Sequence, residues 1–177
     1  DPTEPRPAAV AVAAAVPAPA PKPEAKKEAA PVKLLIITGD EYHNWKETTE
    51  SLKAILSEGG KIAVDVTTSP SKDLTDENLA KYDVFLLNYK DTAKGEPETK
   101  WSDANKEALL KAVREGKGLV SYHFASSAFT KPNWDEFEKA VGGWRTQGFH
   151  GPAHAVKGKK TAAQHPISEG LPAEFDH

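Results

Sequence analysis

The 177-residue chain contains no cysteine and no methionine. Without cysteine it cannot form disulfides, thiolate metal sites, iron–sulfur clusters or a thiol nucleophile, so these classes of chemistry are excluded. The charges nearly balance, with 23 Lys and Arg against 26 Asp and Glu, and they give no reason to expect nucleic acid as a partner. No apolar run approaches the roughly 18 residues of a membrane-spanning helix, so we expect no transmembrane segment.

Alanine and proline dominate residues 1–31, which hold 11 Ala, 8 Pro and no aromatic residue. Proline removes backbone donors and alanine buries little area, so this composition is typical of a disordered, semi-extended spacer. A helix over residues 8–16 is the alternative, because alanine has a high helix propensity. The chain begins at Asp1 without a methionine, and we therefore expect a processed chain or a fragment. A spacer at this place predicts a periplasmic or secreted protein, tethered through its N-terminal segment.

Apolar runs and helical patterns alternate through residues 32–177, which we interpret as one α/β domain. Near-continuous or alternating apolar residues predict strands over 32–38, 62–66, 84–87 and 118–122. Apolar residues at helical spacing predict helices over 45–57, 75–80, 103–115 and 134–140. Buried strands separated by helices imply a mostly parallel sheet with helices on both faces. The expected fold is therefore a flavodoxin-like three-layer α/β sandwich.

Local details of this pattern give further expectations. Leu52, Ile55 and Leu56 fall on one face of the first helix, and we expect all three to face the core. Asn133 is expected to cap the last of the four helices. The apolar signal then weakens, and only residues 154–156 predict a further strand.

Polar and aromatic side chains follow the carboxyl ends of three predicted strands, which is where ligands bind in an open parallel sheet. These residues are Glu41, His43, Trp45, Asn88, Tyr89, His123 and Phe124. Imidazole is the side chain that most often acts as an acid or base near neutral pH. We therefore expect His43, His123 and Glu41 to be catalytic and the other four residues to bind substrate. The alternative is that the two histidines are ordinary surface residues in polar loops.

Two histidines at one edge of a sheet also suit a divalent metal ion, because imidazole is the commonest metal ligand. We expect zinc or a similar ion to be held by His43, His123 and His150, where it would polarise a carbonyl group. No nucleotide cofactor is expected, since the first strand leads into no dinucleotide glycine fingerprint. Serine catalysis through Ser126 or Ser127 is a weaker alternative, because no Gly-x-Ser-x-Gly elbow frames these residues.

Several segments, taken in order, resemble the sequences of ThuA-like (trehalose utilisation) domains. The matching segments are residues 34–45, 82–89, 116–125, 142–144, 165–167 and 170–172. The resemblance covers residues 32–177 and implies the class I glutamine amidotransferase-like fold, which is a flavodoxin-like sandwich. It also implies a role in the catabolism of disaccharides, notably of 3-keto sugars. Such domains usually continue past the position of His177 with an acidic segment and further strands, so we expect this chain to be truncated there.

Relatives with amidotransferase activity carry a cysteine on the turn after the strand that matches residues 118–122, and this chain has His123 at that turn. Because the chain contains no cysteine, it is not a thiol amidotransferase. The leading hypothesis is a carbohydrate-processing domain in which a histidine or Glu41 removes a proton beside a keto group or activates water. Such an enzyme would be a metal-assisted keto-sugar hydrolase, lyase or isomerase.

A non-catalytic alternative stays open at this point. In that interpretation the chain is a sugar-binding or scaffold module of an envelope assembly, held there by its N-terminal spacer. Both hypotheses expect a small carbohydrate as the partner and exclude nucleic acid. The sequence leaves homo-oligomer formation open.

Overall fold

The computed structural model describes residues 30–92, 94–130, 133–143, 152, 154–161 and 165–176. The chain divides into two units, residues 1–30 and 31–177, and the fold described below belongs to the second unit. The spacer predicted over residues 1–31 falls almost entirely outside the described residues. Within the described ranges, no helix has both the length and the apolar character needed to cross a membrane.

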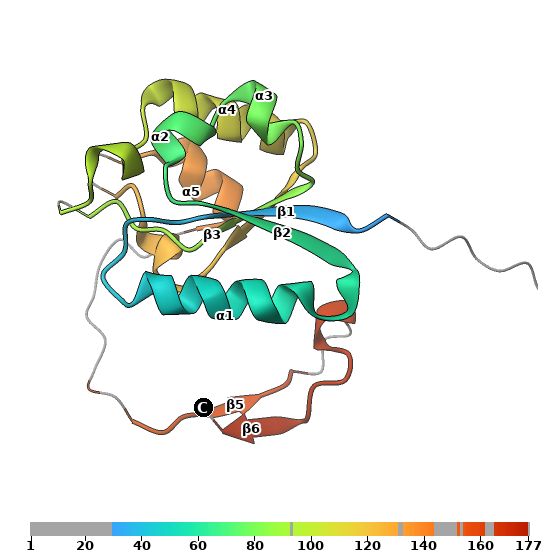
Figure 1. The fold of residues 1–177 in the computed structure, drawn as a ribbon. Coiled ribbons are helices and arrows are strands. Elements are labelled where there is room, and N and C mark those ends of the chain that lie inside the picture. The colour runs from blue at the N-terminus through green and yellow to red at the C-terminus, as the bar shows by residue number, and fades with distance from the viewer. Residues whose placement is uncertain are drawn as a thin grey trace, which may run out of the picture. The chain divides into compact units, whose positions relative to one another are not determined.

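A four-stranded parallel sheet forms the centre of the second unit, with strand order β2-β1-β3-β4 (Figure 1). The strands are β1 Val32–Ile37, β2 Ile62–Thr67, β3 Val84–Leu87 and β4 Gly118–Ser121. Leu35 of the central strand β1 is in register with Asp65 on one side and with Phe85 on the other. The predicted parallel sheet is confirmed. Its two central strands, β1 and β3, read as continuous or near-continuous apolar runs because both of their faces are covered.

Helices lie on both faces of the sheet, as Figure 1 shows. Helix α1 (Trp45–Ser57) covers one face, and four further helices cover the other. These are α2 Pro70–Asp73, α3 Asp76–Leu79, α4 Asp103–Arg114 and α5 Asp135–Val141. Short 3-10 helices are η1 Glu58–Gly60, η2 Pro97–Thr99, η3 His123–Ser127 and η4 Pro166–Ser168. The flavodoxin-like sandwich is therefore confirmed, although α2 and the 3-10 helices were not predicted.

Alternate side chains of the central strands point into two separate cores. The larger core, on the side of α4 and α5, includes Leu35, Ile37, Phe85, Leu87, Leu109 and Phe137. The smaller core, on the side of α1, consists of Leu34, Ile36 and Leu86 with Leu52 and Leu56 packed against it. Full burial of a leucine or phenylalanine side chain contributes roughly 1.5–3 kcal/mol. The two cores therefore hold the strand ends, and the loops that follow them, in fixed positions.

Two local predictions about the helices are wrong. Ile55 is 66% exposed, because α1 turns only Leu52 and Leu56 toward the smaller core. Asn133 does not cap the last helix: the N-cap of α5 is Trp134, which makes no side-chain capping hydrogen bond.

The strand predicted over residues 154–156 lies a few residues further along the chain. Strand β5 (Lys157–Lys159) pairs antiparallel with β6 (Glu174–Asp176), and Gly158 lies opposite Phe175. No residue in either strand is buried. Because neither face of this pair is covered, its sequence carries no apolar run that would mark its position.

Candidate functional site

The loop between β1 and α1, residues 38–44, carries two of the predicted site residues, and we call it the His43 loop. Asn44 caps α1, since its side-chain oxygen accepts a hydrogen bond from the Glu47 amide at 3.4 Å. From the end of β3, the buried Asn88 amide donates to Thr49 Oγ1 at 3.0 Å and to the Trp45 carbonyl oxygen at 3.3 Å. Asn88 was expected to bind substrate. Its observed contacts instead fasten the start of α1 to the sheet.

The imidazole rings of His43 and His123 lie beside each other at the carboxyl edge of the sheet. Their ring centroids are 5.1 Å apart. The half-buried Phe124 ring is 4.9 Å from the His43 ring and 5.1 Å from the His123 ring, and the exposed Tyr42 ring contacts Phe124 at 6.0 Å. The structure therefore brings together the two histidines and Phe124, from two loops that are 80 residues apart in the sequence.

The turn after β4, residues 122–129, has an unusual backbone, and we call it the His123 turn. His123 has φ +48° and Phe129 has φ +57°, and among the described residues no other non-glycine residue has a positive φ. These two positions flank residues 124–128, which include the last four residues of η3. A non-glycine residue in this left-handed region costs on the order of 1–3 kcal/mol, and such strain concentrates at functional sites. At His123 the strained turn presents an imidazole at the sheet edge.

Glu41 adds a carboxylate next to His43. Its Oε2 atom accepts a hydrogen bond from the backbone amide of His43 at 3.0 Å. Its Oε1 atom is buried and has no hydrogen-bond partner within the described part of the chain. Because buried polar atoms are nearly always hydrogen-bonded, this oxygen is a candidate acceptor for a ligand hydroxyl group.

Two charged residues that follow β3 hold the His123 turn in place, and sequence reasoning missed both. Lys90 Nζ donates to the carbonyl oxygen of Ser127, and Asp91 Oδ1 accepts from the backbone amide of Phe129 at 2.7 Å. Lys90 and Asp91 also form an ion pair at 3.3 Å, with side chains only 12% and 22% exposed. These contacts fix the end of the strained turn, so we interpret Lys90 and Asp91 as positioning residues for His123.

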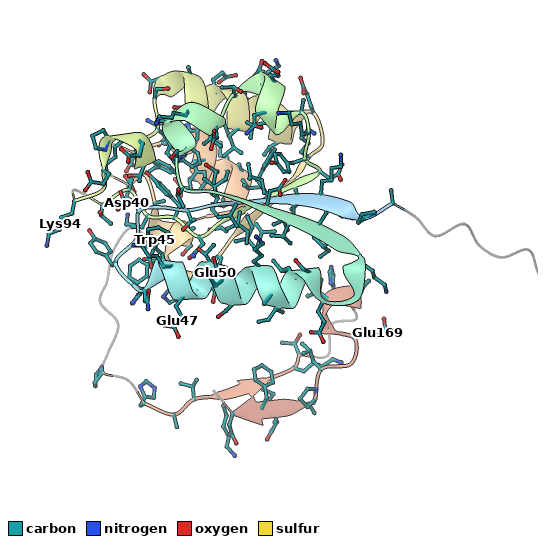
Figure 2. All side chains as sticks on the ribbon, viewed as in Figure 1. Asp40, Trp45, Glu47, Glu50, Lys94 and Glu169 are labelled. Atoms are coloured by element: carbon teal, nitrogen blue, oxygen red, sulfur yellow. The ribbon has the colours of Figure 1, made fainter. Side chains whose placement is uncertain are left out.

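A buried carboxylate, Asp40, lies in the His43 loop (Figure 2) and contacts the segment that follows β3. Asp40 Oδ2 accepts from the Thr92 amide at 2.9 Å and from Lys100 Nζ at 2.6 Å. The Asp40 carbonyl oxygen accepts from the Lys90 amide at 2.6 Å. Asp40 therefore connects the His43 loop to the segment that holds the His123 turn. Its partner Lys100 is 60 residues away, and no local sequence pattern indicates such a pair.

Tyr89 lies in the larger core and not at the surface of the site. Its side chain is fully buried between Trp101 and Phe129, and its hydroxyl donates to the Thr99 carbonyl oxygen at 2.9 Å. Burial raises the pKa of the Tyr89 hydroxyl well above its usual value, and the carboxylates of Asp40 and Asp91 add to the effect. This placement gives Tyr89 a packing role, whereas a substrate contact was expected.

A metal centre needs more ligands than the described residues bring together. Catalytic zinc sites use three protein ligands, and the described part of the chain contains no group of three His, Cys, Asp or Glu side chains placed to hold a metal ion. His150, the third predicted ligand, lies outside the described residues. The described residues alone therefore do not fit a zinc centre, and the metal role of His43, His123 and His150 stays a prediction.

The two serines of the His123 turn are engaged with the backbone. Ser126 Oγ donates to the His123 carbonyl oxygen at 2.9 Å, and Ser127 Oγ donates to the Phe124 carbonyl oxygen at 3.0 Å. An activated serine nucleophile would instead donate to a general base. The geometry therefore gives no support to serine catalysis.

Comparison with known protein families places residues 33–177 in the family described as ThuA, trehalose utilisation. The chain belongs to the ThuA family. The resemblance found in the sequence is thereby confirmed. No curated protein matches the chain significantly.

Two crystal structures of ThuA-like proteins share the fold. The protein from Parabacteroides merdae ATCC 43184 is 28% identical, with a TM-score of 0.66 over 83% of this chain and 60% of its own. The protein from Bacteroides uniformis ATCC 8492 is 23% identical, with a TM-score of 0.63 over 86% of this chain and 61% of its own. At 23% identity, the similarity to the Bacteroides uniformis protein shows a shared fold and nothing more. This ThuA chain thus spans about 60% of the length of these relatives.

Proposed function

We propose that this ThuA chain binds and processes a disaccharide or keto sugar at the His43–His123 site. The observation that carries the proposal is the meeting of the two imidazoles with the ring of Phe124. Glu41, whose Oε2 atom binds the His43 amide, adds a buried Oε1 atom that has no hydrogen-bond partner among the described residues. A sugar offers hydroxyl groups to a carboxylate oxygen and apolar C–H faces to an aromatic ring. The family's description as trehalose utilisation supports the same class of ligand.

The proposed chemistry is proton transfer next to a carbonyl group. One neutral imidazole accepts a proton from the carbon beside the keto group. The electron pair of that C–H bond forms a carbon–carbon double bond, and the π pair of the carbonyl group moves onto its oxygen. The second imidazole, in its protonated form, donates a hydrogen bond to this oxygen and stabilises its negative charge. Glu41 accepts a hydrogen bond from a neighbouring sugar hydroxyl and so orients the ring. Activation of water by the same imidazole is the hydrolytic version of this step.

Alanine substitution of each histidine tests the enzymatic proposal. With the full chain and a 3-keto disaccharide as substrate, His43→Ala and His123→Ala are each expected to lower kcat at least about 100-fold, because each removes a proton-transfer group. His154→Ala is the matched control, since His154 is exposed and its ring contacts the Pro152 carbonyl oxygen at 3.0 Å. Full turnover by both site variants would contradict the proposal.

A second candidate function is a non-catalytic sugar-binding or scaffold module. It is favoured by one observation: among the described residues, neither the His43 nor the His123 ring has a hydrogen-bond partner that would orient it as a base. In this form, the Pro- and Ala-rich residues 1–31 tether the domain in the periplasm or outside the cell. The same two alanine variants would then weaken sugar binding while the chain shows no turnover of its own. Cell fractionation of the native protein tests the location separately.

A further inference from the structure

A second concave surface lies at the same edge of the sheet, on the opposite side of β1 from β4. It is a groove of about 380 Å³ between the first turns of α1 and the end of β2. We call it the Trp45 groove. Its lining includes Trp45, Glu47, Thr49, Glu50, Val66 and Thr68. In Figure 2, Trp45, Glu47 and Glu50 lie along the start of α1. The volume is within the range of small-molecule sites.

Trp45 differs from the other tryptophans that the structure describes. Trp101 and Trp134 pack together with Phe129 in the larger core, where their rings form the aromatic interior. Trp45 is half-buried and belongs to neither core. Lys46 Nζ lies 5.5 Å from the centroid of its ring. Trp45 and Lys46 both line the groove, so part of the half-buried indole is accessible from it.

The polar side chains of the groove suit a sugar ring. Glu50 is exposed and has no hydrogen-bond or ion-pair partner among the described residues, so its carboxylate is free to accept from ligand hydroxyls. One carboxylate oxygen of Glu47, Oε2, accepts a hydrogen bond from Asn44 Nδ2 at 2.8 Å. The C–H face of a pyranose is apolar and slightly positive, which complements the negative face of an indole. An aromatic platform with carboxylate acceptors at its rim therefore fits a neutral, hydroxyl-rich ring.

The groove is also connected to the His43 loop. The Trp45 amide donates to the His43 carbonyl oxygen at 2.8 Å, and Asn88 binds the Trp45 carbonyl oxygen. Trp45 is two positions after His43 in the chain, so their Cα atoms lie within about 7 Å of each other. The two surfaces are distinct but adjacent, because none of the residues that line the groove belongs to the His43–His123 pair.

We propose that the Trp45 groove is a second sugar subsite, which stacks one pyranose ring on the indole of Trp45 and binds its hydroxyls through Glu50. The class of ligand rests on the function proposed above, whereas the site itself rests on the groove and on the half-buried position of Trp45 outside both cores. The probe that tests it is trehalose, a neutral disaccharide of two pyranose rings.

The experiment is an NMR titration of trehalose into the isotope-labelled full chain. The indole N–H signal of Trp45 is expected to shift and saturate, while that of the core residue Trp101 stays in place. Trp45→Ala is expected to weaken binding at the groove about tenfold, because it removes an aromatic stacking contact. Glu50→Gln is expected to weaken it several-fold. Glu58→Gln, an exposed glutamate at the other end of α1, is the matched control and is expected to change nothing.

The imidazole C–H signals of His43 and His123 in the same spectra separate the two proposals. Histidine shifts without a Trp45 shift would overturn the subsite and leave the proposed function standing. A Trp45 shift without histidine shifts would support the subsite and contradict the proposed function. Equal shifts of Trp45 and Trp101, or no shift at all, would overturn the subsite. If Trp45→Ala fails to fold, Trp45→Phe and Glu50→Gln supply the same test, since both keep the local packing.

Discussion

The two turns that carry the imidazoles are built in different ways. The His123 turn has left-handed backbone at His123 and at Phe129, both of which carry side chains that disfavour it. Lys90 and Asp91 hold this turn from the neighbouring strand end. The strain is therefore balanced by specific contacts with partly buried charged groups.

The His43 loop places its left-handed position at a glycine instead. Gly39 has φ +116°, and a glycine adopts this conformation without the steric cost that a side chain brings. The loop then ends at the Asn44 cap and is fastened by Asn88. The comparison teaches that the two imidazoles at the sheet edge are held in different ways. The strained His123 turn is fixed by side-chain contacts, whereas the His43 loop is free of such strain. Asp40 connects the His43 loop to the segment that holds the His123 turn.

The largest effect is expected for Asp40→Ala, which removes this connection. The substitution leaves the Thr92 amide and the Lys100 ammonium without their buried acceptor, and we expect a loss of about 3 kcal/mol of unfolding free energy. Urea unfolding measures it. Asp103→Ala is the control, because Asp103 is fully exposed and its one ion pair within the described part of the chain is with Lys106 on its own helix, and little change is expected. Equal losses of unfolding free energy for the two substitutions would contradict the claim that Asp40 anchors the His43 loop.

Gly39→Ala, in the His43 loop, is expected to lower the free energy of unfolding by about 2 kcal/mol. A Cβ atom at this residue would lie 2.7 Å from the Thr68 carbonyl oxygen, in addition to the strain of its φ. Gly59→Ala is the matched control, since Gly59 has φ +77° and open space around its Cβ position. Thermal or urea unfolding should show the smaller loss for Gly59→Ala, about 1 kcal/mol. Identical losses would mean that the close approach to Thr68 has no consequence.

Asp91→Ala is expected to make the His123 turn less rigid and to lower the free energy of unfolding by about 1 kcal/mol, because the Phe129 amide loses its acceptor. Hydrogen exchange at the Phe129 amide should become faster, and the imidazole signal of His123 should move. Asp91→Asn keeps an oxygen acceptor and should retain most of the protection at Phe129. A loss of stability without any change at His123 would assign Asp91 a structural role only.

The smallest effect is the difference in stability between a glycine and an alanine variant, made at His43 and at His123. At His123, the glycine variant should be more stable than the alanine variant by about 1 kcal/mol, because glycine removes the left-handed strain. At His43, where no positive φ is present, the order should reverse, since glycine has the larger conformational entropy when unfolded. Urea unfolding of the four variants measures both differences. The same order at both positions would contradict the contrast between the two turns.

Most of the fold could be predicted from the sequence, because its signals are local. β3 is a continuous apolar run and β1 is one apart from Lys33, and the α1 prediction over residues 45–57 matches the observed helix. Ile55 was assigned to the core because it sits at helical spacing from Leu52, yet the narrow smaller core reaches only one side of the helix. The β5–β6 pair was misplaced because its exposed strands have no apolar pattern.

The site could be predicted only in part. The meeting of His43 and His123 follows from topology, since both residues come after parallel strands that end at one edge. The support around them depends on contacts between distant segments, such as Asp40 with Lys100 and Lys90 with Ser127, and no spacing rule indicates these. The burial of Tyr89 was missed because residues after a strand end alternate in direction, and Tyr89 turns into the core.

The central claim is that His43 and His123 act together on one carbohydrate, and a double-mutant cycle tests it most directly. Trehalose affinity would be measured from the Phe124 amide signal in the unmodified chain, in His43→Ala, in His123→Ala and in the double variant, with His154→Ala as the control. We expect each single variant to weaken binding and the two losses to be non-additive by at least about 0.5 kcal/mol, as for side chains that contact one ligand together. Additive losses, or unchanged affinity in both single variants, would contradict the claim.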